Sequence, residues 1–269
     1  MSAGGSGEAA AGMPHNNLIA LGALGGLIAI YAAHFLVASI GPYMSFLGGI
    51  GAIAGVVWGA AAVRRVASYG LGTGVPSIGM IALGMGIVAT TFGLAVGGVA
   101  GPVLAVIFAA LIGLLVGLLA NKVLSMGIPI MVQSMAEISM AGTITIIGLS
   151  VAMVGSFTFE SVLTGVIATG YIAVIFIAGG LAILHPFNAN LGPDEKQDRT
   201  LATALEKGAI AMVIAGIVAS INAGASGAIT IIVGIAIWYI GFSKFYKFVK
   251  RDAYSVVGTG MLPTEEELA

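Results

Sequence analysis

The chain has 269 residues, of which 59% are hydrophobic and 8% charged, and its formal net charge is −1. With a mean hydropathy of +1.10, this composition lies outside the range of soluble globular domains and indicates an integral membrane protein. The small net charge does not point to a nucleic-acid partner, and the absence of cysteine excludes disulfides, thiolate metal sites and iron–sulfur ligation in this chain.

The first 17 residues, MSAGGSGEAAAGMPHNN, are small and polar. They lack the basic segment that precedes the apolar stretch of a secretory signal peptide. We therefore expect residues 1–17 to form a flexible cytoplasmic arm. Residues 18–243 should form a transmembrane domain, and residues 244–269 a cytoplasmic tail.

Apolar stretches that do not alternate with period two follow this arm, and they predict an all-α, polytopic transmembrane helix bundle. A bilayer core of about 30 Å needs roughly 20 apolar residues in a helix. Eight stretches qualify, at residues 18–40, 43–63, 78–99, 102–120, 129–155, 162–184, 202–221 and 228–242. The seventh is short, so it spans only if the preceding TLATALEK belongs to the same helix; otherwise there are seven spans.

The basic residues indicate the orientation of these spans. All ten follow even-numbered spans, as Arg64, Arg65, Lys122, Lys196, Arg199, Lys207, Lys244, Lys247, Lys250 and Arg251. Since Lys and Arg accumulate in cytoplasmic loops, both termini should be cytoplasmic, with cytoplasmic loops at residues 64–77, 121–128 and 185–201.

Glycine and proline predict how the spans pair. Gly-Pro pairs at residues 41–42 and 101–102 join the first span to the second and the third to the fourth, which favours tight helical hairpins. Small residues also recur at four-residue spacing, a pattern that lets helix backbones approach closely in lipid. The examples are Gly22 and Gly26, Gly51, Gly55 and Gly59, and Gly113 and Gly117.

Two predicted cytoplasmic segments resemble each other. RRVASYGLGTGVPSIGM follows the second span and KRDAYSVVGTGMLP follows the eighth, which suggests duplicated hairpin units. One interpretation is a helix stop used twice. The other is a glycine-rich surface that docks a soluble partner, together with the HPFNAN segment of the longest loop. Its candidate residues are Tyr69, Gly72, Thr73, Gly74, Pro76, His185, Asn188, Asn190, Tyr254, Gly258, Thr259 and Gly260.

Glu137 is a single carboxylate in the fifth predicted span. If the helix begins at Pro129, Glu137 lies about 12 Å into the cytoplasmic half of that span. An ionised side chain at such depth costs at least a few kcal/mol, so it should face a protein interior or a wet cavity. Gln133, one turn earlier, and the nearby Ser134 supply further oxygens. The set suits Na⁺ or a proton relay.

Other interpretations of Glu137 stay open at this stage. The carboxyl group could be protonated, could pair with Lys122 or Arg64, or could contact a neighbouring subunit. Glu160, at the outer mouth of the fifth and sixth predicted spans, needs no compensation if it reaches water. Isolated histidines, among them His15, His34 and His185, do not have the spacing of a metal site.

Specific phrases along nearly the whole chain resemble one known family. SYGLGTGVPSIGM and HPFNANLGP, together with MPHNNLIALGALGGLIAIYAAHF and GPYMSFLGG, are similar to the C subunit of the membrane-bound tetrahydromethanopterin S-methyltransferase of methanogenic archaea. The resemblance implies a cell-membrane complex that moves a methyl group from methyl-tetrahydromethanopterin to coenzyme M and couples the transfer to Na⁺ export.

The same resemblance implies the partners. The corrinoid and the methyl-transfer chemistry are expected on other subunits, with no cofactor bound by this chain and no catalytic residue in it. The polytopic D and E subunits are the expected neighbours in the ion-translocating body. An ion ligand at Glu137 is our own interpretation of this sequence. The alternatives are a stand-alone secondary transporter and a scaffold that conducts nothing.

Overall fold

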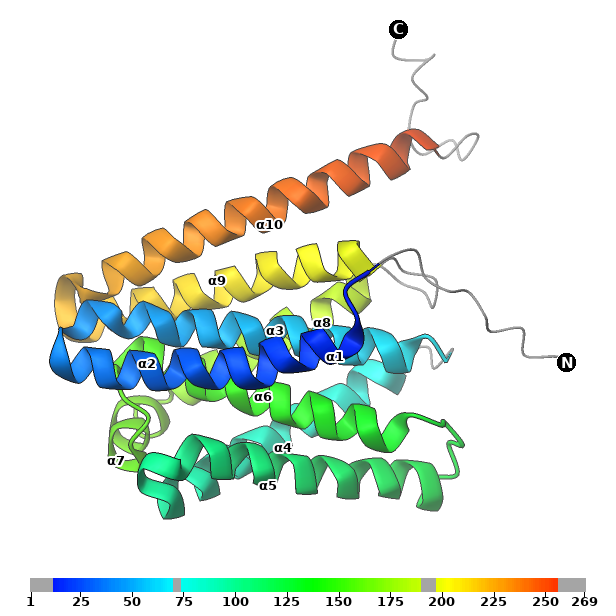
Figure 1. The fold of residues 1–269 in the computed structure, drawn as a ribbon, viewed down its shortest axis with the longest axis horizontal. Coiled ribbons are helices and arrows are strands. Elements are labelled where there is room, and N and C mark those ends of the chain that lie inside the picture. The colour runs from blue at the N-terminus through cyan, green and yellow to red at the C-terminus, as the bar shows by residue number, and fades with distance from the viewer. Residues whose placement is uncertain (1–11, 70–73, 190–196, 256–269) are drawn as a thin grey trace, which may run out of the picture.

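The computed structural model describes residues 12–69, 74–189 and 197–255 (Figure 1). All regular structure within these ranges is helical, which confirms the predicted class. The α-helices are α1 (His15–Ala20), α2 (Gly26–Ser39), α3 (Phe46–Ala67), α4 (Gly74–Gly97), α5 (Gly101–Leu118), α6 (Met131–Val154), α7 (Phe159–Val162), α8 (Tyr171–Ala189), α9 (Gln197–Ala223) and α10 (Gly227–Ser255). A π-helical turn, Leu21–Gly25, joins α1 to α2.

Six helical segments of the described chain are long and apolar enough to cross a membrane, and a bent pair would make a seventh. One of the six, Ser77–Val123, has 47 residues. This segment contains both α4 and α5, which fold back on each other around Gly98, whose φ is +51° (Figure 1). The hairpin predicted at residues 101–102 is therefore present.

The sixth predicted span, at residues 162–184, is broken rather than one continuous helix, and it counts as a candidate span only if the bent pair that contains it is taken as one. Phe159–Ile167 and Tyr171–Phe187 meet at an angle of 90°. The break falls at Gly170, whose φ of +80° is in the left-handed region that glycine adopts without steric cost. The seventh span, in contrast, does continue from the TLATALEK segment, because α9 begins at Gln197.

Helix α6 lies at the centre of the bundle and packs against α3, α4, α5 and α9. Small residues permit these close approaches. A Cβ added to Gly148 of α6 would lie 2.6 Å from the Ala52 backbone nitrogen of α3, and one added to Gly113 of α5 would lie 2.5 Å from the Met135 carbonyl oxygen. The predicted role of the spaced glycines in packing is confirmed at Gly55, Gly113 and Gly117, each of which faces another helix backbone.

Basic residues gather at one end of the bundle. Helices α3, α5, α8 and α10 end, and α1, α4, α6 and α9 begin, at the right-hand end in Figure 1. Arg64 and Arg65 occupy the last turn of α3, and Lys122 lies in the π-helical turn that continues α5. Because the described basic residues lie near these helix ends, the predicted loops share one side.

Candidate functional site

Glu137 lies near the start of the most buried helix. Helix α6 begins at Met131 rather than at Pro129, so Glu137 is about 9 Å along the helix instead of the predicted 12 Å. Only 3% of the residue is exposed. Gln133, one turn earlier, donates from Nε2 to Glu137 Oε1 at 2.8 Å. Gln133 therefore lies beside Glu137 as its position along the helix predicts, with its amide nitrogen rather than its oxygen toward the carboxylate.

Helix α3 supplies two further partners to the carboxylate, one hydrogen-bond donor and one cation. The Trp58 indole Nε1 donates to Glu137 Oε2 at 3.2 Å, and a terminal nitrogen of Arg65 lies 3.7 Å from Oε1. Trp58 and Arg65 are seven residues apart, which is two helical turns, and they therefore share one face of α3. The guanidinium is partly exposed, with a side-chain exposure of 36%, whereas Trp58 is buried.

The fourth partner comes from the start of the described chain. His15, the first residue of α1, places Nε2 2.7 Å from Glu137 Oε2. Leu18, one turn later, is buried against the bundle. Gln197, at the start of α9, donates to the carbonyl oxygen of Met13 at 2.9 Å. These three contacts hold α1 against the end of the bundle that carries the basic residues.

The electrostatics of this cluster differ from those of a formed cation site. Three of its four described partners, His15, Trp58 and Gln133, hydrogen-bond to the carboxylate, and Arg65 adds a full positive charge at 3.7 Å. Such donors stabilise an ionised carboxylate in a buried position. They do not offer the oxygen ligands that a hard cation needs. In this arrangement the cluster is a carboxylate bound by internal donors.

Ser134 is the third residue of the predicted ion site, and it has a different environment. It lies one turn before Glu137 and is 1% exposed. Its hydroxyl oxygen is buried, and no hydrogen-bond partner is found for it within the described ranges. The structure therefore places the hydroxyl near the carboxylate along α6 without joining the two.

The cationic groups beside Glu137 were not the ones expected. Sequence position favours Lys122 and Arg64 as partners of Glu137. In the structure, Arg65 and His15 contact the carboxylate. Two signals were available in the sequence: the seven-residue spacing of Trp58 and Arg65, and a histidine directly after Pro14 at a helix start. Neither signal shows that residue 15 reaches a carboxylate 122 residues later.

The predicted docking residues lie partly outside the described ranges. Gly72, Thr73, Asn190, Gly258, Thr259 and Gly260 fall there. Tyr69 follows α3 with 50% exposure. Gly74 and Pro76 are in the first turn of α4, Asn188 is in the last turn of α8, and Tyr254 is near the end of α10. These positions share the bundle end that carries the basic residues (Figure 1). His185 instead lines a groove between α8 and α9.

Within residues 12–69, 74–189 and 197–255, no group of three or more His, Asp or Glu side chains could hold a metal ion. Comparisons with known proteins cover the whole chain. The family of the tetrahydromethanopterin S-methyltransferase C subunit matches residues 1–266. Full-length proteins of that description are similar to this chain, with 64% identity over 100% of both chains in Methanosarcina mazei. In Methanothermobacter marburgensis the identity is 46%, over 99% of this chain and 100% of the relative.

Proposed function

This chain belongs to the family of the tetrahydromethanopterin S-methyltransferase C subunit and is a membrane-bound component of that enzyme, and we propose that it forms part of the body through which the complex exports Na⁺. The export is coupled to methyl transfer from methyl-tetrahydromethanopterin to coenzyme M, by way of a corrinoid on another subunit. The observation that supports a role in transport is the buried carboxylate of Glu137 inside the helical bundle, because ionisable residues within membrane spans mark ion pathways.

The membrane topology follows from the same proposal. Counting α4 and α5 as two spans and the bent α7–α8 segment as one gives eight. The charges at one end of the bundle support a cytoplasmic location for that end and for both termini. The neighbours in the membrane are the polytopic D and E subunits. The corrinoid-bearing subunit docks on the cytoplasmic end, where Tyr69 is exposed, α4 begins and α10 ends.

Glu137 acts in this proposal through exchange of partners. When His15 leaves, one carboxylate oxygen loses its shortest hydrogen bond. Gln133 can then turn its amide to present oxygen, and the Ser134 hydroxyl, which is buried without a partner among the described residues, can supply a third oxygen. Docking and release of the corrinoid subunit shift the bundle between these two arrangements, which expose the ion site alternately.

A non-conducting scaffold is the second candidate function. The observation that favours it is the set of partners itself, because three hydrogen bonds and one guanidinium compensate Glu137 without any ion. Under this alternative the cluster joins α1, α3 and α6 and stabilises the subunit. A stand-alone transporter has no comparable support, since the family is that of an enzyme subunit.

Sodium transport by the reconstituted complex tests the proposal. We expect Glu137→Gln to abolish sodium uptake per methyl group transferred while the complex still assembles. Glu160→Gln is the matched control, because Glu160 is exposed at the opposite end of the bundle. Unchanged sodium coupling in Glu137→Gln would reject Glu137 as a transport ligand.

A second variant separates transport from scaffolding. If His15 competes with the ion, His15→Ala should lower the sodium concentration for half-maximal activity about tenfold or more, because a hydrogen bond to a charged group contributes about 1.5–3 kcal/mol. If the cluster is only a scaffold, the same variant should reduce the amount of assembled complex and leave the sodium dependence of each assembled complex unchanged.

A further inference from the structure

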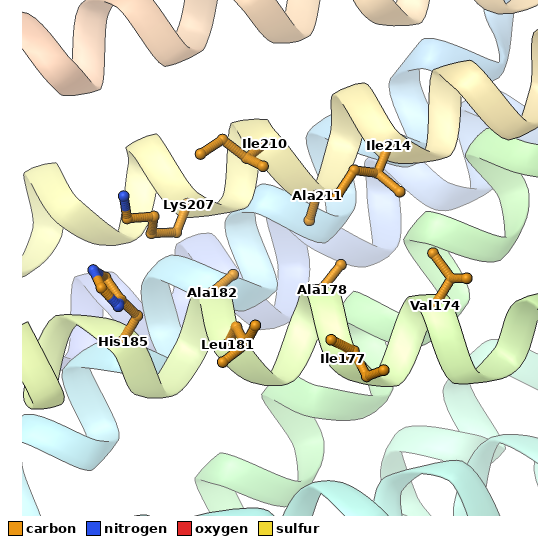
Figure 2. A pocket seen from close by; sticks show the side chains of 10 residues that line it. All are labelled: Val174, Ile177, Ala178, Leu181, Ala182, His185, Lys207, Ile210, Ala211 and Ile214. Atoms are coloured by element: carbon orange, nitrogen blue, oxygen red, sulfur yellow. The ribbon is translucent and has the colours of Figure 1, made fainter.

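A groove lies between α8 and α9 (Figure 2). Its volume is about 460 Å³. Val174, Ile177 and Leu181 line it from α8, and Ile210 and Ile214 line it from α9. Ile177 and Leu181 are each more than half exposed, so the groove opens sideways from the bundle, toward the bilayer. An open apolar groove at this position must be filled by lipid or by another protein.

One end of the groove is polar. His185 of α8 and Lys207 of α9 face each other there, while the other labelled side chains along the groove are apolar (Figure 2). Lys207 donates from Nζ to the buried carboxylate of Glu206 at 2.8 Å. Its side chain is 28% exposed, and an ammonium group has three donors, so donors remain for a second acceptor. This polar end lies toward the bundle end that carries the other basic residues.

The lining of the groove matches the parts of a lipid. The lining residues of α8 run from Val174 to His185, which corresponds to about 16 Å of helix. Apolar side chains of both helices line most of this length, which suits a hydrocarbon chain, whereas the amino group of Lys207 and the imidazole of His185 lie together at one end, which suits an anionic headgroup.

We propose that the α8–α9 groove binds a membrane lipid with an anionic phosphate headgroup. One hydrocarbon chain lies along Val174, Leu181 and Ile214, and the phosphate accepts hydrogen bonds from Lys207 and His185. Basic pockets between transmembrane helices at the cytoplasmic side bind such headgroups in the same way. This inference depends on the membrane location of α8 and α9 and is independent of whether Glu137 carries an ion.

Photolabelling of the intact complex tests the lipid site. The complex is placed in phosphatidylcholine nanodiscs that contain a small fraction of either phosphatidylglycerol or phosphatidylcholine with a diazirine in the acyl chain. After irradiation, labelled peptides of this chain are quantified by mass spectrometry. We expect phosphatidylglycerol to label peptides of α8 and α9 in preference to phosphatidylcholine, with excess unlabelled phosphatidylglycerol competing.

Substitutions at the polar end should shift the labelling in opposite directions. Lys207→Gln keeps an N–H donor for Glu206 but removes the charge, and should lower phosphatidylglycerol labelling about fivefold, the factor for one lysine near an anionic headgroup. Glu206→Gln removes the carboxylate that competes for Lys207 and should raise phosphatidylglycerol labelling. Lys244→Gln, on α10 at the same bundle end, is the control and should leave phosphatidylglycerol labelling unchanged.

Two results would overturn the proposal. Equal labelling by both lipids, or labelling that does not respond to Lys207→Gln, would mean that bulk lipid fills the groove without headgroup recognition. Crosslinks from α8 and α9 to a protein subunit in place of lipid would mean that a partner covers the groove. Only variants that assemble into complexes of normal subunit composition are compared, so failure to fold does not enter the result.

Discussion

Replacing His15 with alanine should loosen the N-terminal helix. In the structure α1 is held at its first turn by the bond from His15 to Glu137, which is 2.7 Å long, and by burial of Leu18. The carbonyl oxygen of Met13 adds a hydrogen bond from Gln197. His15→Ala removes the first of these contacts and leaves the other two in place. The variant therefore measures how much one charged hydrogen bond contributes to the attachment of α1.

The magnitude follows from the type of bond. A hydrogen bond to a charged group contributes about 1.5–3 kcal/mol. The His15 side chain is 21% exposed, so water replaces part of the lost bond, and we take the lower half of that range, about 1.5–2 kcal/mol. Since about 1.4 kcal/mol corresponds to a factor of ten, the population in which α1 has detached should rise about 10- to 30-fold.

Cysteine labelling can measure this population, because the chain contains no cysteine. Leu18 is 1% exposed, so a thiol introduced by Leu18→Cys should react with a maleimide only when α1 detaches. The labelling rate of this chain is compared with and without His15→Ala, and Asn16→Ala, an exposed neighbour, serves as the control.

Glu137→Gln should also raise the rate, and combining it with His15→Ala should add little, because both changes remove the same bond. A labelling rate that His15→Ala leaves unchanged would refute the assigned role of this bond.

Two further predictions concern the backbone. Gly148→Val should prevent normal assembly of the complex, because the new side chain would collide with the Ala52 backbone. Gly84→Val should be tolerated, since nothing lies within 4 Å of a Cβ added there. The yield of intact complex measures both effects. In the loop before α6, Ser125 has a φ of +54° and Gly127 a φ of +65°. Ser125→Gly should remove about 1 kcal/mol of unfavourable conformational free energy and Gly127→Ala should add about as much. The first variant should therefore slow proteolysis of that loop and the second should accelerate it; changes of the same sign would contradict this reasoning.

The helices were predictable from the sequence because a bilayer requires long apolar stretches, although α10 continues to Ser255, well past the predicted end at residue 242. The break in the sixth span was not predictable from hydropathy. Residues 162–184 are apolar throughout, so the pattern does not show that Gly170 adopts a left-handed conformation. Thr169 and Gly170 are a weak local signal, because the same pair of residue types at Thr164 and Gly165 lies inside the preceding helical segment.

The site was predictable only along its own helix. Gln133 and Glu137 are four residues apart, so their contact follows from helical geometry. The contact of Arg65 with Glu137 depends on the rotation of α3 about its axis. The packing of Gly48 and Gly55 against α6 determines that rotation. The contact with His15 depends on where α1 docks, and the polar composition of the N-terminal residues indicated an arm without contacts.

The way in which the cluster is built determines which of its bonds can break. Trp58 belongs to α3, which is packed backbone to backbone against α6 at Gly48 and Gly148, and its buried ring cannot withdraw without disturbing these two central helices. Arg65 lies on the same helix, but its side chain is partly exposed and makes a longer contact of 3.7 Å. Gln133 shares the helix of Glu137. Among these four described partners, only His15 belongs to a short peripheral element, α1. Movement of α1 is therefore the one backbone movement that removes a partner of Glu137 and leaves α3 and α6 in place, and the labelling rate at residue 18 reports that movement directly.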